Sequence, residues 1–173
     1  MANTTFDGPV RSKNGFINIG PGMTKSLTAD TTLSVQEHAG RILLLNDTDG
    51  KFTLPSIVTT ADSAVAGPGS DPNNLNNIGA SFYFYVETLA TDLDIKTDGT
   101  DKFKGAVIIA VDDGAKKAFV PAAANDVMTF DGTVKGGIVG SVLRVTAIDT
   151  NNYLVHDSLM IGSSTIETPF ADA

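Results

Sequence analysis

Residues 81–86 read Ser-Phe-Tyr-Phe-Tyr-Val, and both alternating sets of side chains in this run are largely apolar or aromatic. Successive side chains of a strand point to opposite faces of a sheet, so a strand of this kind needs cover on both faces. The run predicts a strand that lies either centrally between two layers or against another subunit. Tyr83 and Tyr85 are therefore our candidates for a subunit interface.

Residues 103–111, Phe-Lys-Gly-Ala-Val-Ile-Ile-Ala-Val, show a one-sided pattern. The odd-numbered positions carry large apolar side chains at Phe103, Val107, Ile109 and Val111, whereas the opposite face begins with Lys104. This alternation predicts a strand with one face on a hydrophobic core.

The rest of the chain repeats short apolar runs between turn signals. Asp outnumbers Glu 17 to 3, and residues that are poor in helix interiors are abundant. Turn dipeptides able to supply a tight reversal stand at 14–15, 49–50, 98–99, 113–114 and 131–132. The expected strands are 31–35, 41–45, 51–54, 81–87, 92–97, 103–111, 116–120, 126–130, 138–148, 152–157 and 164–168. Their spacing predicts an all-β chain, folded as an antiparallel β-sandwich or barrel of the jelly-roll kind.

Two regions break this rhythm. Residues 1–24 hold a few isolated apolar side chains among Gly-Pro steps, which predicts an extended N-terminal arm that becomes ordered on another surface. Residues 25–173 form the predicted sandwich domain, and residues 55–80 form a long loop insertion in it without a clear period.

Composition and charge exclude several classes of protein. The chain has 173 residues, of which 42% are hydrophobic and 18% charged, so it is too apolar for a disordered protein. Its longest apolar stretch, residues 105–111, is too short to span a bilayer, and the N-terminus has no pattern of a secretory signal. The net charge of −8 argues against nucleic acid as a partner. The charge is uneven, because residues 8–29 contain three basic side chains and no acidic one.

The sequence contains no recognisable catalytic motif. Neither a nucleophile elbow nor a phosphate-binding glycine loop is present. With no Cys there is no thiolate metal site, and only His38 and His156 can supply imidazole. His156 and Asp157 are adjacent, and adjacent residues of a strand point to opposite faces, so we expect an ordinary surface or hydrogen-bonded histidine. The acidic residues from Asp92 to Asp101 do not match a calcium loop. We therefore expect no cofactor, no metal and no enzymatic activity.

Several motifs resemble a known group of proteins. The opening, Phe-Asp-Gly-Pro-Val-Arg-Ser-x-Asn-Gly-Phe at residues 6–16, resembles the N-terminal arm of virion surface proteins from tailed phages, particularly those of marine cyanobacteria. Residues 40–45, 52–55, 79–84, 94–97 and 105–107 resemble a β-rich module of phage capsid decoration, or cement, proteins. The long insertion at 55–80 departs from the shortest form of that module.

The resemblance implies a non-enzymatic protein that binds the outside of the assembled shell and stabilises it, as a homotrimer. Its partner is then the major capsid protein, and its place is the capsid exterior after assembly in the host cytoplasm. The expected contacts of the arm are apolar anchors at Phe6, Val10, Phe16 and Ile17, with Arg11 and Lys13 pairing acidic groups of the shell. The alternative is a tail-fibre or other receptor-binding virion protein that recognises a host surface glycan through the 55–80 loop and the aromatic strand.

Overall fold

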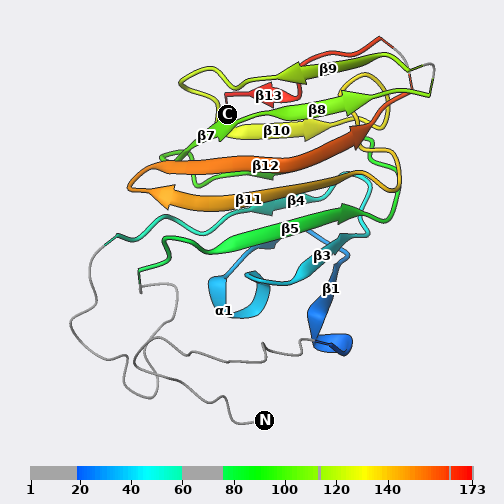
Figure 1. Ribbon diagram of the computed structural model, residues 1–173. Helices are drawn as coiled ribbons and strands as arrows, with labels where there is room; N and C mark the ends of the chain where they lie inside the picture. Colours follow the sequence, from blue (N-terminus) through cyan, green and yellow to red (C-terminus); the bar gives the residue numbers. More distant parts are fainter. Residues whose placement is uncertain (1–18, 60–75, 113, 164, 173) are drawn as a thin grey trace, which may run out of the picture.

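The computed structural model describes residues 19–59, 76–112, 114–163 and 165–172. These residues are almost entirely β, which confirms the predicted fold class (Figure 1). The elements are η1 (Pro21–Met23), β1 (Thr24–Leu27), β2 (Thr31–Thr32), α1 (Val35–His38), β3 (Ile42–Leu45), β4 (Lys51–Thr53), β5 (Ser81–Val86), β6 (Leu93–Lys96), β7 (Lys102–Gly105), β8 (Val107–Ala110), β9 (Lys116–Phe119), β10 (Val127–Phe130), β11 (Val142–Asp149), β12 (Asn152–Ile161) and β13 (Phe170–Ala171). No helix among the described residues has the length and apolar character needed to cross a membrane.

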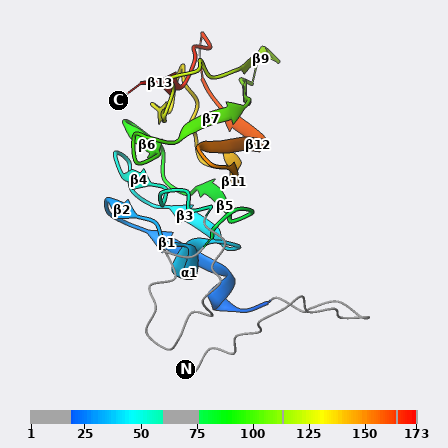
Figure 2. The ribbon, with the colours of Figure 1, turned by 90° about the vertical axis from the view of Figure 1, so that its left-hand side faces the viewer.

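The strands form two sheets that face one another as a sandwich. An eight-stranded sheet has the order β1-β3-β5-β11-β12-β8-β9, with β7 also paired to β12, and a five-stranded sheet has the order β13-β10-β6-β4-β2. Figure 2 shows the two layers edge-on, with β2, β4 and β6 on the left and β5, β11 and β12 on the right. The side chains between the layers form one hydrophobic core.

The sheets are mixed and not purely antiparallel, which corrects the predicted strand pairing. Among the described strand pairs, six are parallel (β1 with β3, β3 with β5, β2 with β4, β4 with β6, and both β7 and β8 with β12) and five are antiparallel. The turn at Asp49 and Gly50 leads from β3 in one sheet to β4 in the other, and so makes no hairpin. The chain from β1 to β6 thus changes sheet at each of its five connections, and each strand from β3 to β6 pairs in parallel with the strand two before it in the sequence.

Strands of the second half of the chain pair in the antiparallel direction with the parallel strands of the first half. β11 pairs with β5, and β10 pairs with β6 in the opposite sheet. In the first of these junctions Phe84 stands between Leu43 of β3 and Leu143 of β11, and all three side chains are buried. The predicted inward face of residues 103–111 is confirmed, because Phe103, Val107 and Ile109 are fully buried.

Several strand boundaries differ from those expected. β1 at Thr24–Leu27 is absent from the predicted strands and spans the predicted boundary between arm and body, and Leu27 is its only large apolar side chain. Residues 103–111 form two strands, β7 and β8, since Gly105 has a φ of +93° that interrupts the extended backbone. The last strand is β13 at 170–171, and residues 165–168 form no strand.

The two described ends of the 55–80 insertion are fastened together against the sandwich. Asn77 donates through its side chain to the carbonyl of Ser56 at 2.8 Å, and its own side-chain oxygen accepts from the N–H of Val58 at 2.8 Å. The N–H of Ile57 donates to the buried carboxylate of Asp101 at 2.9 Å. The insertion therefore leaves and rejoins the body at one place.

Gly105 carries the closest backbone approach in the eight-stranded sheet, and this gives a test of the fold. A Cβ at Gly105 would lie 2.1 Å from the carbonyl oxygen of Val155 on β12, whereas a Cβ at Gly99, which has a similar φ of +91°, would meet nothing within 4 Å. A left-handed φ alone costs about 1–3 kcal/mol in a residue with a side chain. We expect Gly105→Ala to lower the free energy of unfolding in urea by at least about 1 kcal/mol more than Gly99→Ala. Equal losses in the two variants would contradict the close approach.

Tyr153 ties the start of the insertion to the core and gives a second test. Its buried hydroxyl donates to the carbonyl of Pro55 at 2.5 Å, and burial raises the pKa of Tyr153 above its usual range. Because the raised pKa belongs to the folded state, its stabilising contribution is complete below about pH 10, the ordinary tyrosine pKa, and is lost as the pH rises above it. We expect Tyr153→Phe to lower the free energy of unfolding by about 1–2 kcal/mol at pH 7, because it leaves a buried carbonyl unpaired. Between pH 7 and pH 11 the variant should then lose less stability than the unchanged chain, since it has no hydroxyl to ionise. Urea unfolding at both pH values measures this, with Tyr85→Phe as the control on the half-exposed outer face.

Candidate functional site

The outer face of the eight-stranded sheet, which points away from the core, carries the predicted interface residues. On β5 the side chains of Phe82, Phe84 and Val86 are buried in the core, while those of Tyr83 and Tyr85 lie half-buried on the opposite face. β5 lies within the sheet in Figure 1, between β3 and β11. The two tyrosines are thus placed where another molecule can reach them.

Tyr85 belongs to a row of uncharged side chains that crosses the sheet, which we call the Tyr85 row. Its register partners are Leu44 on β3 and Val142 on β11, and Val142 is in turn opposite Leu159 on β12. Leu159 and the nearby Ile108 of β8 remain 49% and 42% exposed. Large apolar side chains that stay exposed together on one face are typical of a contact surface.

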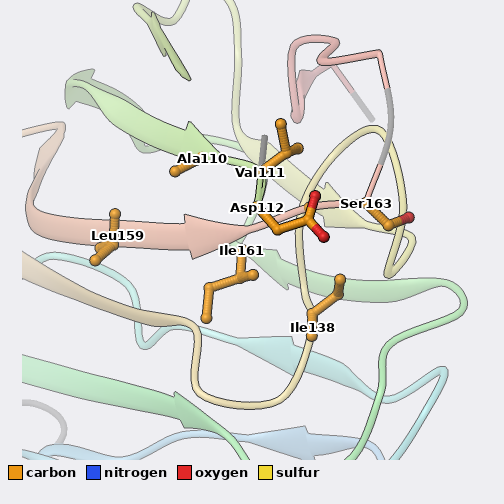
Figure 3. A pocket seen from close by; sticks show the side chains of 8 residues that line it. Ala110, Val111, Asp112, Ile138, Leu159, Ile161 and Ser163 are labelled. Carbon is orange, nitrogen blue, oxygen red and sulfur yellow. The ribbon is translucent and has the colours of Figure 1, made fainter. Parts of the chain in front are cut away.

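Two shallow cavities flank Leu159, which lines both. One has a volume of about 330 Å³ and lies between Ala110 of β8, Leu159 and Ile161 of β12, and Ile138 of the loop before β11 (Figure 3). The other, of about 410 Å³, lies beside Ile108. Both carry apolar surface from the Tyr85 row toward β8, but Asp112 lines the first cavity, and His156 and Asp157 line the second.

A second row of side chains on the same face, two residues along β3, β5 and β11 from the Tyr85 row, is largely polar. Tyr83 stands between Ile42 of β3 and Arg144 of β11 in register, and Arg144 is opposite His156 of β12. The guanidinium carbon of Arg144 lies 5.4 Å from the centroid of the Tyr83 ring, which is a cation–π contact. The same guanidinium lies 3.4 Å from the carboxylate of Asp157, and because both side chains are well exposed this ion pair contributes little to stability.

The expectation that His156 and Asp157 point to opposite faces is wrong. The pairing of β11 with β12 shifts between Val142 and Arg144, so the chain bulges there, and Asp157 has a φ of +47°. The bulge turns Asp157 onto the outer face, where its carboxylate lies 3.3 Å from Nδ1 of His156. Because of this bulge, the buried positions of β12 change from odd at Tyr153 and Val155 to even at Met160.

His156 continues a polar chain across the face. Its Nε2 lies 2.9 Å from the hydroxyl of Thr146, which donates to the hydroxyl of Ser81 at 3.0 Å. Carboxylate, imidazole and hydroxyl stand here in the order of a hydrolytic triad. However, β11 pairs with β5 on one side and β12 on the other, so the N–H groups around Thr146 serve the sheet and are not aimed at its hydroxyl as an oxyanion hole. The arrangement positions polar groups along the sheet.

A third cavity on this face contains the arginines. It has a volume of about 370 Å³ and is lined by Gly40, Arg41, Ile42, Ser81, Tyr83 and Arg144. Sequence reasoning missed Arg41, Ser81, Thr146 and Arg144, since strand register places them together over distances of up to about a hundred residues along the chain. The available signal was the rarity of arginine, which occurs three times in 173 residues.

The other predicted sites have separate outcomes. The arm contacts Phe6, Val10, Arg11, Lys13, Phe16 and Ile17 all lie outside the described residues. His38 is a buried, hydrogen-bonded histidine that accepts from the N–H of Ser34 at 3.0 Å, and burial lowers its pKa. Within the described ranges no cluster of His, Asp and Glu is arranged to hold a metal ion. The acidic residues considered for calcium have separate partners. Asp94 forms an ion pair with Lys51 and accepts a hydrogen bond from the hydroxyl of Thr129, and Asp101 accepts one from the N–H of Ile57.

Comparisons with known proteins add no assignment. No family model, no curated protein and no solved structure matches the chain. Its role has to be inferred from its own residues and their geometry.

The bulge at Asp157 gives a test of the site's geometry. Glycine adopts a positive φ without a steric cost, whereas alanine does not, and both remove the weak surface ion pairs of the carboxylate. We expect Asp157→Gly to be more stable than Asp157→Ala by about 1 kcal/mol in urea unfolding. If the alanine variant is equally stable or more stable, Asp157 does not have the left-handed backbone that brings it beside His156.

Proposed function

We propose that this chain is a structural virion protein that binds the outside of an assembled phage capsid and stabilises it, as a homotrimer. The observation that carries the proposal is the Tyr85 row, whose uncharged side chains span β3, β5, β11 and β12 and end at Leu159, near the exposed Ile108 of β8. Such a surface on a rigid sandwich suits a lasting contact with protein, because each square ångström of apolar area removed from water contributes about 25 cal/mol.

We assign the Tyr85 row to contacts between subunits and the N-terminal arm to contacts with the major capsid protein. The arm region is basic where the rest of the chain is acidic, with no acidic residue between positions 8 and 29. Three arms held in one trimer act at a high effective concentration, so each arm can bind weakly while the assembly stays attached. The apolar anchors Phe6, Val10, Phe16 and Ile17 and the basic Arg11 and Lys13 remain our predicted contacts.

A second candidate function is recognition of a host surface glycan by a receptor-binding virion protein. The arginine-lined cavity beside Tyr83 favours it, because it offers charged, hydroxyl and aromatic groups together on an accessible face. This candidate uses the polar row and not the Tyr85 row.

The first candidate is tested by sedimentation with phage capsids that lack the protein. We expect the full chain to be a trimer by light scattering and to pellet with the capsids. A chain that begins at Ile19 lacks every predicted arm contact but keeps β1, and should stay in the supernatant as a trimer. Tyr85→Glu places a charge in the uncharged row, and should give a monomer of 18.0 kDa that pellets poorly because avidity is lost.

Leu89→Glu is the matched control, since Leu89 is 48% exposed in the connection between β5 and β6 and lies off the Tyr85 row. It should behave as the unchanged chain. A trimeric Tyr85→Glu variant would refute the assigned subunit contact, and pelleting of the chain that begins at Ile19 would refute the role of the arm. If the full chain does not pellet, the capsid function is wrong.

A further inference from the structure

The two arginines within the described residues lie close together, although the chain as a whole is acidic. The net charge is −8 and the sequence holds only three arginines, yet both of those within the described residues, Arg41 and Arg144, line the same cavity. None of the residues lining that cavity is acidic. We infer that the cavity binds the carboxylate of an acidic saccharide.

Each arginine reaches the cavity from a firmly held piece of backbone. Arg144 stands in the middle of three paired strands and is stacked on Tyr83, with its guanidinium carbon 5.4 Å from the ring centroid. Arg41 follows Gly40, whose N–H donates to the carbonyl of Ser81 at 2.8 Å and so holds this segment against β5. The pairing of β3, β5 and β11 therefore places Arg144 beside Tyr83 on one flank and Ile42, which follows Arg41, on the other flank.

Arg144 retains capacity for a ligand. A guanidinium has five N–H donors in a planar fork, and the ion pair with Asp157 engages it at a single distance of 3.4 Å, through Nη1. Asp157 does not line the cavity, although its negative charge lies close enough to oppose an anion there. Stacking on an aromatic ring leaves the edge of the fork available, which is the edge that pairs with a carboxylate in two parallel hydrogen bonds.

The remaining lining groups favour a sugar as the carrier of that carboxylate. Ser81 and Tyr83 offer hydroxyl groups, and Ile42 offers an apolar surface for the C–H side of a sugar ring. Ser81 is oriented by the hydrogen bond that it accepts from Thr146. A volume of about 370 Å³ falls within the range of small-molecule sites. Phosphate sites more often use backbone N–H groups at helix ends or nests, which do not line this cavity.

The inference rests on the second candidate function and is independent of capsid binding. Capsid binding is scored by sedimentation and subunit mass, whereas this site is scored by saccharide binding to the purified full chain. Either result can therefore fail without the other.

The test is a titration of the full chain with sodium glucuronate, in which binding is measured by NMR of the backbone amides and by calorimetry. Glucose and inorganic phosphate serve as the neutral and the non-saccharide comparison. We expect saturable shifts at residues 40–42, 81–83 and 144, with glucose and phosphate each weaker by about tenfold or more, the worth of a charge-assisted hydrogen bond.

Variants distinguish recognition of the carboxylate by the arginine guanidinium groups from nonspecific electrostatic attraction. Arg144→Gln, Arg144→Lys and Arg41→Gln should each weaken glucuronate binding by about tenfold or more. Asp157→Asn should strengthen it, since it removes the opposing charge. Lys116→Gln, which removes one positive charge from exposed β9, is the control and should bind as the unchanged chain does.

Three outcomes would overturn the inference. They are the absence of saturable shifts with glucuronate, binding of phosphate as tight as that of glucuronate, and arginine variants that bind as well as Lys116→Gln. Because the side chain of Arg144 is 43% exposed, we expect its variants to fold. If Arg144→Gln does not fold, Arg144→Lys, which keeps the positive charge, tests the site in its place.

Discussion

The pairing of β5 with β11 is the contact on which the rest of the structure depends. It joins the parallel strands β1, β3 and β5 to the antiparallel pair β11 and β12, and β6 with β10 makes the same junction in the opposite sheet. Phe82 and Phe84 are fully buried at this junction, so a shift of register by one residue would move both of them into water. The constraint that fixes the core therefore also fixes which side chains flank Tyr83 on the outer face.

The outer face combines two chemistries because the strands present alternate residues to it in parallel rows. The Tyr85 row is uncharged across four strands, whereas the next row places Arg144 on Tyr83 and beside His156. An uncharged row suits lasting association with protein, and a polar row suits recognition of a small charged group. Both surfaces lie within one rigid sheet, which holds them in a constant relation.

Local backbone strain contributes to the polar row. Asp157 adopts a positive φ within a bulge, and among the described non-glycine residues it alone does so. Ser158 next to it bonds the N–H of Ile108 and the carbonyl of Ala106, and so bridges β12 to the residues around the β7–β8 break. Such a bulge costs pairing in the ladder but re-aims side chains, and here it brings a carboxylate to both an imidazole and a guanidinium.

The sequence by itself determined the all-β class and the inward face of residues 103–111, because alternation of apolar residues depends only on the local geometry of a strand. Residues 81–86 are apolar or aromatic on both faces, so only the structure decided that Tyr83 and Tyr85 lie on the outer face. Turn signals such as Asp49 and Gly50 mark where a strand ends, but they do not say whether the next strand pairs with it or crosses to the facing sheet, so the parallel pairing of β1, β3 and β5 was decided by the tertiary structure. The same holds for the cavity between Arg41 and Arg144, which are about a hundred residues apart and meet only through the register of β3, β5 and β11. Long-range register is set by the packing of the whole core, and no local run of residues encodes it.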